Sequence, residues 1–434
     1  MQLVAYGAQD VYLTGNPQIT FWKVVYRRHT NFAMESIEQT FNGTANFGKK
    51  VTCTISRNGD LVHKVYLQVT LPKLKAAALA TTGNSTVRWA DHIGHRLIKS
   101  VEVEIGGQQI DKHYGEWLNV LHELSCPSEK LAGEQTMLGY SNTEFTNVAD
   151  GSVDQTSDNV THITQTTDAT TLYIPLQFWF CRNPGLAVPL IALQYHEVKI
   201  NLEFNALVNN MVLVDDDKTA ATAVWEAGTT ADNLDSTSLA SAALWVDYIY
   251  LDTDERRRFA QVSHEYLIEQ LQFTGTETLN ASSTNKVRMN FNHPVKELVW
   301  VADGPEHVAA DSNANPPVVE ITGAPLTWQS LTGNVKMLLN GHDRFAERDS
   351  SYFNLVQPYQ HHTRVPSGKN VHCYSFALKP EEHQPSGTCN FSRIDNATLQ
   401  IGTAANEARS LRLFAVNYNV LRVMSGMGGL AYSN

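Results

Sequence analysis

The chain has 434 residues, of which 42% are hydrophobic, and its 44 acidic and 33 basic side chains give a formal net charge of −11. A single hydrophobic core rarely grows beyond roughly 250–300 residues, so this length predicts two domains, and the apolar fraction argues against a disordered chain. An acidic surface repels phosphate, which argues against direct packaging of nucleic acid.

Strand signals dominate the chain. Residues 61–71 form an apolar-rich run that ends at Pro72, and residues 100–105 alternate apolar with polar side chains before two glycines; both patterns are typical of half-buried strands. Residues 115–124 are the best candidate for a short amphipathic helix. Further segments rich in β-branched and aromatic residues predict strands at 171–180, 196–204, 244–251, 265–273, 286–291, 335–339, 371–378 and 411–421.

The strand pattern repeats once along the chain. Residues 101–107 match 335–341, and the final strand of each copy matches at 245–248 and 415–418. The order of the matching segments is preserved while their spacing shrinks, which indicates longer loops in the first copy. Two segments of that copy, 125–170 and 206–242, have the Ser, Thr, Asn, Asp and Ala content typical of loops.

Two similar units of about eight strands predict an all-β protein made of two tandem jelly rolls, because a jelly roll pairs two four-stranded sheets. A charged run follows the last strand of the first copy and marks the joint between the units. The predicted organisation is an N-terminal arm at 1–22, a first jelly roll at 23–252, a linker at 253–264, and a second jelly roll with a C-terminal tail at 265–434.

Seven blocks of sequence are distinctive, and together they cover both ends of the chain and most of the predicted strands. They are residues 2–21, 26–28, 189–199, 245–249, 264–270, 385–399 and 418–432. These blocks closely resemble the major capsid proteins of nucleocytoplasmic large DNA viruses, especially those of algal viruses.

The resemblance implies a double jelly roll that forms a homotrimer, in which six jelly rolls give a pseudo-hexagonal capsomer. Capsomers would tile an icosahedral virion shell over an internal membrane. The implied partners are other copies, neighbouring capsomers and minor capsid proteins beneath the shell, with no direct nucleic-acid contact and only indirect membrane contact. The expected role is structural, with no catalysis and no cofactor. Since neither a signal peptide nor a run of 18 apolar residues occurs, we expect synthesis and assembly in the host cytoplasm.

Two other functions fit the same fold prediction. A minor capsid or vertex paralogue would differ from the major species only in its abundance in virions. A carbohydrate-binding or carbohydrate-active β-sandwich would belong to a different class. Such an enzyme needs two carboxylates about 5–9.5 Å apart across a cleft, and no paired-acid motif indicates one.

No metal site is predicted. The five cysteines form no C-x-x-C pair. Residues 92–95 match the nucleotide-binding tetrapeptide of class I aminoacyl-tRNA synthetases, but here they precede a strand of an all-β unit, which is the wrong structural context for that motif. As a metal-binding pair, His92 and His95 lack a Cys, Asp or Glu at ligand spacing. His361 and His362 are expected in a solvated loop.

The glycine-rich segment at 425–429 is interpreted as a flexible tail, since it leaves no room for a phosphate-binding helix. The arm is predicted to contact neighbouring subunits, because its apolar side chains precede the first domain and require a partner. The candidate assembly contacts are Tyr6, Tyr12, Phe21, Trp22, Arg27 and Arg28. Candidate glycosylation sites in predicted loops are Asn84, Asn159 and Asn280, each within an N-x-S/T sequon.

Overall fold

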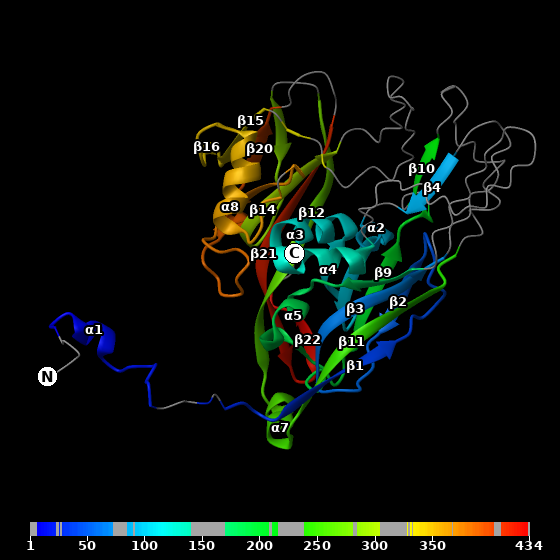
Figure 1. The fold of residues 1–434 in the computed structure, drawn as a ribbon, viewed down its shortest axis with the longest axis vertical. Coiled ribbons are helices and arrows are strands. Elements are labelled where there is room, and N and C mark those ends of the chain that lie inside the picture. The colour runs from blue at the N-terminus through cyan, green and yellow to red at the C-terminus, as the bar shows by residue number, and fades with distance from the viewer. Residues whose placement is uncertain are drawn as a thin grey trace, which may run out of the picture.

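The structure is a computed structural model, and it shows two all-β domains with an extended arm at the N-terminus (Figure 1). The residues that it describes are 7–22, 26, 28–72, 85–89, 92–139, 170–207, 211–215, 238–280, 284–303, 328, 330–331, 333–366, 368–402 and 409–432. No helix in this described part is long and apolar enough to cross a membrane.

The first domain is a jelly roll of two antiparallel sheets. One sheet has the order β1 (Phe32–Gln39), β11 (Ser241–Leu251), β3 (Leu61–Leu71) and β7 (Thr170–Pro175), with β8 (Val188–Pro189) also on β3. The other has the order β2 (Lys50–Thr54), β9 (Val198–Phe204), β5 (Ile98–Ile105) and β6 (Gln108–Tyr114). A separate ribbon pairs β4 (Ser85–Trp89) with β10 (Met211–Asp215).

The second domain repeats this arrangement. One sheet has the order β12 (His264–Leu279), β21 (Arg409–Met424), β14 (Pro294–Asp303) and β18 (His372–Ser375), with β19 (Cys389–Asn390) on β14 and β22 (Met427–Leu430) on β21. The other has the order β13 (Asn285–Arg288), β20 (Ala397–Ile401), β15 (Asn334–Leu339) and β16 (His342–Asp343), with β17 (Arg348–Asp349) on β15. Because the two strand orders correspond one to one, the predicted tandem jelly rolls are confirmed.

Corresponding hairpins in the two domains make the same turn. Gly106 and Gly107 join β5 to β6 with φ of 59° and 85°, and Asn340 and Gly341 join β15 to β16 with φ of 50° and 81°. Two consecutive positive φ angles match the right-handed twist of a hairpin and favour Gly and Asn. The sequence match at 101–107 and 335–341 therefore reflects one turn geometry used twice.

Short helices lie between the strands, with corresponding positions in the two domains. In the first domain, α3 (Gly115–Ser125) follows β6, and the predicted helix at 115–124 is confirmed. In the second, a π-helical turn, η3 (Tyr352–Val356), and α8 (Gln357–His361) follow β17. The remaining helices are α1 (Asp10–Thr14), α2 (Ile93–Leu97), α4 (Ser128–Leu138), α5 (Trp179–Arg182), η1 (Pro184–Leu186), α7 (Thr253–Gln261) and η4 (Phe391–Arg393).

Several sequence predictions were wrong in detail. The expected strand at 171–180 ends at Pro175, and α5 takes up its last residues. The expected loop at 125–170 contains helix α4. The predicted linker at 253–264 stays a prediction, and the structure adds that it contains helix α7. Asp252 Oδ1 caps this helix by accepting from Thr253 N at 2.7 Å, and acidic residues lie in its first turn.

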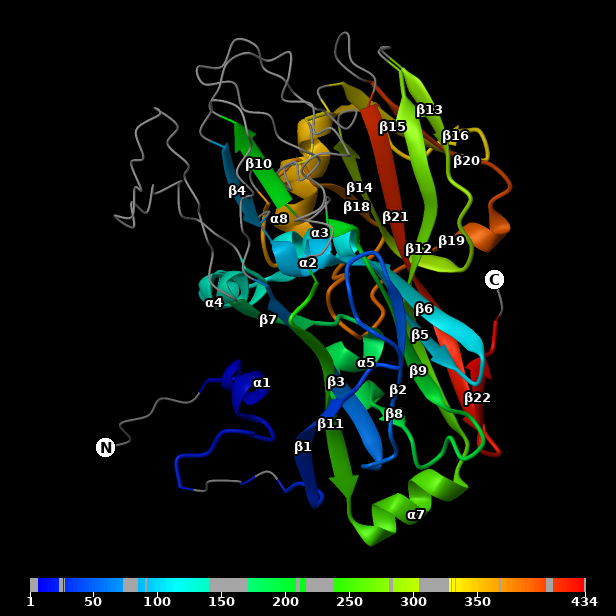
Figure 2. The same cartoon turned by 90° about the vertical axis from the view of Figure 1, so that its right-hand side faces the viewer.

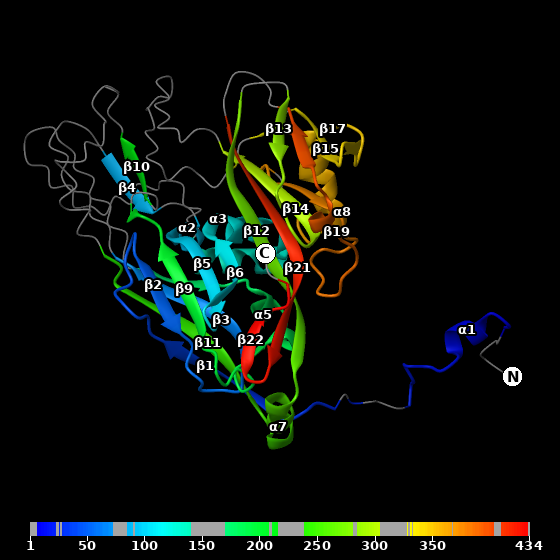
Figure 3. The ribbon, with the colours of Figure 1, turned by 180° about the vertical axis from the view of Figure 1, so that it is seen from behind.

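The glycine-rich segment near the C-terminus is not a flexible tail. Ser425 and Gly426 turn the chain with positive φ, and β22 returns antiparallel to β21. The hairpin packs on the first domain, where Tyr195 N donates to Gly426 O at 3.0 Å. Figure 3 shows β22 beside the strands of the first jelly roll, so the end of the chain fastens the second domain to the first.

Candidate assembly surfaces

Helix α3 lies between the two jelly rolls and contributes to a core on each side. Leu118 belongs to the core of the first domain. Trp117, Val120 and Leu124 form a cluster with residues of the second domain. Their spacing of three and four residues places them on one helical face. Figure 2 shows α3 between the two jelly rolls, and its nonpolar residues join the core of the first domain and the cluster shared with the second.

Strands β14 and β21 are buried on both faces, which is why the second domain can accept α3. Leu298 and Trp300 point into the core of the second domain, whereas Val299 and Val301 join the cluster around Trp117. On β21, Leu413 and Ala415 face the second core, while Phe414 and Val416 face the first domain. Alternate residues of a strand point to opposite faces, so a continuous apolar run is required here.

An ion network crosses the domain boundary. Arg182 Nη1 of α5 lies 2.9 Å from Glu269 Oε2 of β12. The other carboxylate oxygen of Glu269 lies 2.7 Å from Lys296 Nζ, whose side chain is only 2% exposed. Burial alone would raise the pKa of Glu269, but the charges of Arg182 and Lys296 hold it below its ordinary value. The network is therefore ionised, and it fixes how the two domains pair.

A second set of polar contacts surrounds α3. Glu116 accepts hydrogen bonds from Arg412 and, at 3.0 Å, from Trp328 Nε1. Arg364 N donates to Leu124 O at 3.0 Å, and its guanidinium Nη2 lies 3.0 Å from Glu123 Oε2. These partners all belong to the second domain. The polar contacts of α3 therefore join the same two domains as the nonpolar cluster around Trp117.

The N-terminal arm extends away from both domains, as Figures 1 and 3 show. Its large side chains lie in solvent: Tyr12 is 92% exposed, Phe21 88% and Trp22 90%. Val11, Leu13, Ile19 and Tyr26 are exposed as well. Such a concentration of exposed apolar side chains is characteristic of an interaction surface.

The candidate assembly residues fall into two groups. Tyr12, Phe21 and Trp22 lie in the exposed arm, and Arg28, which follows the arm, is exposed as well. Tyr6 and Arg27 lie outside the described residues. Among the candidate glycosylation sites, Asn280 is exposed just after β12, and its backbone N donates a 2.9 Å hydrogen bond to Asn285 Oδ1. Asn84 and Asn159 lie outside the described residues.

His92 and His95 do have acidic and thiol neighbours, which the spacing along the sequence did not reveal. Helices α2, α3 and α4 bring them together with His122, Glu123, Cys126 and Glu134 in the interior of the first domain. Burial, reinforced by the neighbouring histidines, lowers the pKa of both His92 and His95 to about 3. Of this pair, His92 thus has potential co-ligands in His122 and Glu123.

His362 does not lie in a solvated loop. Its side chain is 3% exposed and lies between Glu381 and Glu297, at 3.0 Å from Nδ1 to Glu381 Oε1 and 3.4 Å from Nε2 to Glu297 Oε2. Burial would lower the pKa of His362, but Cys373, Glu381 and Glu297 together raise it well above its ordinary value. The sequence neighbour His361 is the last residue of α8, and its Nδ1 lies 3.0 Å from Leu378 O.

A cavity of about 620 Å³ opens among the residues just before β3, those just after β8, the end of β11 and Arg256 of α7. Asp60 is the one carboxylate among its lining residues. Its two oxygens already accept from Leu251 N at 2.8 Å and pair with Arg256 Nε at 3.0 Å. This cavity therefore lacks the two opposed carboxylates that a glycoside hydrolase requires.

The fold thus defines a protein of the double jelly-roll class, with an exposed aromatic arm. Comparison with known sequences agrees: residues 20–252 match the family described as "Major capsid protein N-terminus", and residues 255–429 match "Large eukaryotic DNA virus major capsid protein". The chain belongs to the family of major capsid proteins of large eukaryotic DNA viruses.

Individual relatives span the whole chain. The major capsid protein of Pyramimonas orientalis virus is 54% identical over 100% of this chain and 99% of its own length, and that of Paramecium bursaria Chlorella virus 1 is 43% identical over the same shares. A chain of the quasi-atomic PBCV-1 virus capsid is similar with a TM-score of 0.73 and 38% identity, covering 96% of this chain and 100% of that one. The Faustovirus major capsid protein, with a TM-score of 0.70 over 96% and 94% of the two chains, is 14% identical and supports the fold alone.

Proposed function

We propose that this major capsid protein works as a homotrimer in which six jelly rolls form a pseudo-hexagonal capsomer. The observation that carries the proposal is the pair of topologically equal jelly rolls held as one body by α3 and the Arg182–Glu269 ion pair. Two equal units per chain give three chains an approximate sixfold outline, which is a shape that tiles a surface. The role is purely structural and requires no cofactor.

The mass of the purified oligomer tests this proposal. Native mass spectrometry of the full chain is expected to show a discrete species at three times the 48.3 kDa of one chain. A stable monomer at the concentration used for assembly would contradict the trimer. Counting copies per virion by quantitative mass spectrometry separates a major from a minor shell component.

The arm is proposed to bind neighbouring capsomers or minor capsid proteins beneath the shell after the trimer has formed. The aromatic side chains of its described residues, 7–22, are exposed, and this segment contributes no strand to either jelly-roll sheet. We expect deletion of residues 1–20 to leave trimers intact and to impair assembly of shells. On this proposal, assembly takes place in the host cytoplasm. The chain does not bind nucleic acid directly, and it contacts the internal membrane only indirectly.

A finer experiment separates the aromatic side chains from the length of the arm. The triple substitution Tyr12→Ser, Phe21→Ser and Trp22→Ser removes the apolar surface, while Gln18→Ala with Thr20→Ala in the same arm is the matched control. Electron microscopy of assembly reactions is expected to show shells for the control and few for the aromatic variant, with trimers in both. Loss of trimers in the aromatic variant, or normal shells from it, would refute this role of the arm.

Two smaller assignments accompany this function. The domain limits are proposed to be 23–252 and 265–434, with 1–22 as the arm and 253–264 as the connection.

Asn280, Asn84 and Asn159 are proposed as glycan acceptors, and Asn280 is exposed at the end of its strand. Peptide mapping of protein from virions by mass spectrometry would detect the added glycan mass, and unmodified peptides at all three positions would contradict the assignment.

A further inference from the structure

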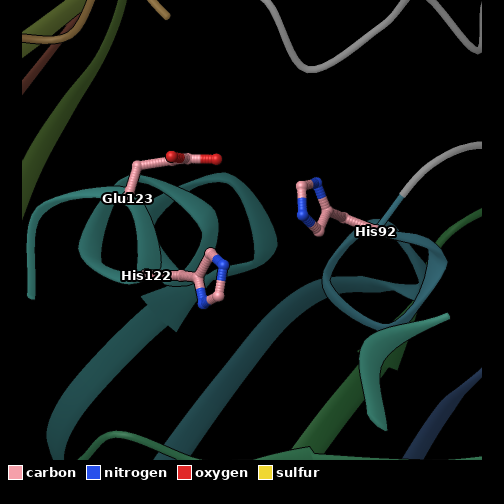
Figure 4. A group of neighbouring side chains, drawn as sticks. All are labelled: His92, His122 and Glu123. Carbon is pink, nitrogen blue, oxygen red and sulfur yellow. The ribbon is translucent and has the colours of Figure 1, made fainter. Parts of the chain in front are cut away.

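Three helices of the first jelly roll converge on a buried group of metal-ligating side chains. His92 precedes α2, His122 and Glu123 belong to α3, and their side chains are almost completely buried. One nitrogen from each ring and one carboxylate oxygen all lie within 4.8 Å of one another. Figure 4 shows the rings of His92 and His122 facing each other, with the carboxylate of Glu123 extending from α3 beside the space between them.

The environment of His122 is the second observation that indicates a ligand. Its side chain is 1% exposed, and its Nδ1 lies 3.2 Å from Glu134 Oε1 of α4. Its Nε2 has no hydrogen-bond partner among the described residues. A buried polar atom without a partner costs about 1–3 kcal/mol, so a position of this kind calls for an explanation such as an ion. A metal-bound histidine commonly gives its other nitrogen to a carboxylate, and Glu134 Oε1 lies near enough to Nδ1 of His122 for that role.

From this arrangement we propose that the first jelly roll binds one zinc-class divalent cation through His92, His122 and Glu123. Two imidazole nitrogens and one carboxylate oxygen are a ligand set that suits Zn²⁺ and leaves its fourth position for water. Glu134 is the positioning residue: it orients the ring of His122 through Nδ1 and does not touch the ion.

The chemistry of the neighbouring groups agrees with a cation of this class. The ring of His92 is almost completely buried beside His122 and Glu123, and imidazole is a common zinc ligand. Arg364 of the second domain lies 3.0 Å from Glu123 Oε2 and fixes the carboxylate from outside the group. Carboxylate and imidazole donors together favour transition metals over Ca²⁺ or Mg²⁺, which take oxygen ligands.

A competing ligand set shares His122. Cys126 Sγ and Glu134 also approach His122 within 4.8 Å, and an ion there would be bound through sulfur. All three side chains of the set with His92 and Glu123 are buried, whereas Glu134 in the other set is partly exposed. The set with His92 and Glu123 is therefore favoured, and the two sets differ in a measurable way because only one contains sulfur.

The ion would join α2 to α3, the helix that separates the jelly rolls. The two helices already approach closely: a Cβ placed on Gly115, the first residue of α3, would lie 2.1 Å from His95 O and 2.2 Å from Ile98 O. The connection would therefore rigidify the part of the first domain on which the second domain packs.

The experiment uses the full-length protein after treatment with a chelator and dialysis into metal-free buffer. Zn²⁺ alone is titrated by isothermal calorimetry and by the shift in Tm, and Co²⁺ is used as a spectroscopic probe. We expect one Zn²⁺ per chain, a Tm that rises with Zn²⁺ concentration as linkage requires, and Co²⁺ absorption typical of four-coordinate nitrogen and oxygen ligation. If the folded protein binds no Zn²⁺, the proposal is overturned. If sulfur-to-cobalt charge-transfer bands appear, the ligands are those of the set containing Cys126, and the set of His92, His122 and Glu123 is refuted.

Variants separate the ligands from the positioning residue and from ordinary buried histidines. Glu134→Gln is expected to weaken Zn²⁺ binding by about 10–100-fold, and His92→Gln and Glu123→Gln by more. His372→Gln, which alters a buried histidine of the second domain, is the matched control and should leave Zn²⁺ binding unchanged. Binding by folded His92→Gln with unchanged affinity would refute the ligand set. If a ligand variant fails to fold, X-ray absorption spectroscopy of the zinc-loaded wild type identifies the ligands instead. The proposed set predicts two imidazole scatterers and no sulfur around the zinc.

Discussion

Arg182 of the first jelly roll pairs with Glu269 of the second, with 2.9 Å between Nη1 and Oε2. The same carboxylate binds Lys296 at 2.7 Å, and both Glu269 and Lys296 lie in the second domain. One buried carboxylate thus compensates two cations, of which only one comes from its own domain. The ion pair between the domains and the ion pair within the second domain are therefore not independent.

Replacing Glu269 by Ala is expected to lower the free energy of unfolding by about 3–5 kcal/mol, because it leaves Lys296 buried without its countercharge. Chemical denaturation followed by fluorescence measures the loss. Glu265→Ala is the matched control on the same strand, since Glu265 pairs with Arg422 at the surface and should cost at most about 1 kcal/mol. Adding Lys296→Met to Glu269→Ala should restore part of the stability. Equal losses for Glu265→Ala and Glu269→Ala would contradict this account.

Truncation of Trp117 to Ala is expected to uncouple the domains as well as destabilise them. Trp117 is buried against Phe414, with 5.3 Å between ring centroids, and removing such a side chain typically costs about 3–5 kcal/mol. Differential scanning calorimetry should show that the unfolding transition broadens or splits, because each jelly roll then unfolds with less dependence on the other. Tyr359→Ala, at an exposed aromatic residue of α8, should leave the profile unchanged; a split in that control would show that the effect is not specific to the boundary.

Stability should depend on pH through His362. The pKa of His362 is raised well above its ordinary value in the folded protein. The stabilisation from the charged ring is therefore fully present below the unfolded pKa of about 6.5 and is lost as the pH rises through the folded pKa. The Tm of the wild type should fall relative to that of His362→Gln between about pH 6 and 8. A difference in Tm that stays constant over this range would refute the assignment.

His372 should give the opposite dependence on pH. Burial lowers its pKa to about 4, and its Nε2 lies 2.9 Å from Ser350 Oγ. Because the folded pKa lies below the unfolded one, stability is retained above about pH 6.5 and lost as the pH falls toward 4, by at most about 3 kcal/mol. His372→Gln keeps a polar side chain near Ser350 and should lose less stability than the wild type on acidification. Parallel acid profiles for the two proteins would contradict the prediction.

The duplicated fold could be predicted because the repeated features are local. The turn at Gly106 and Gly107 and its counterpart at Asn340 and Gly341 impose the same positive φ angles, and each follows an alternating strand. Helix α7 could also have been found from Asp252 at the cap and the acidic residues after it. The continuous apolar run of β14 was a signal that both faces of that strand are buried.

The polar clusters could not be predicted, because they depend on contacts between distant segments. His92 and Glu123 come from different helices, and only the close approach of α2 and α3 brings them together. His362 received its partners Glu297 and Glu381 from a strand and from a loop. Helix α4 has little apolar periodicity to mark it, since Leu138 is its one buried residue.

The strands that face both domains have a consequence for synthesis. The core of the first jelly roll includes Ile268, Leu421 and Val423, and the last two are near the end of the chain. At 5–20 residues per second the ribosome needs about 8–35 s to translate the second half after the first. During that interval Trp117 and its neighbours on α3 lack the second-domain side chains that cover them in the finished fold. The first jelly roll therefore completes its core only when strands β12 and β21 are present, so its folding is coupled to synthesis of the second.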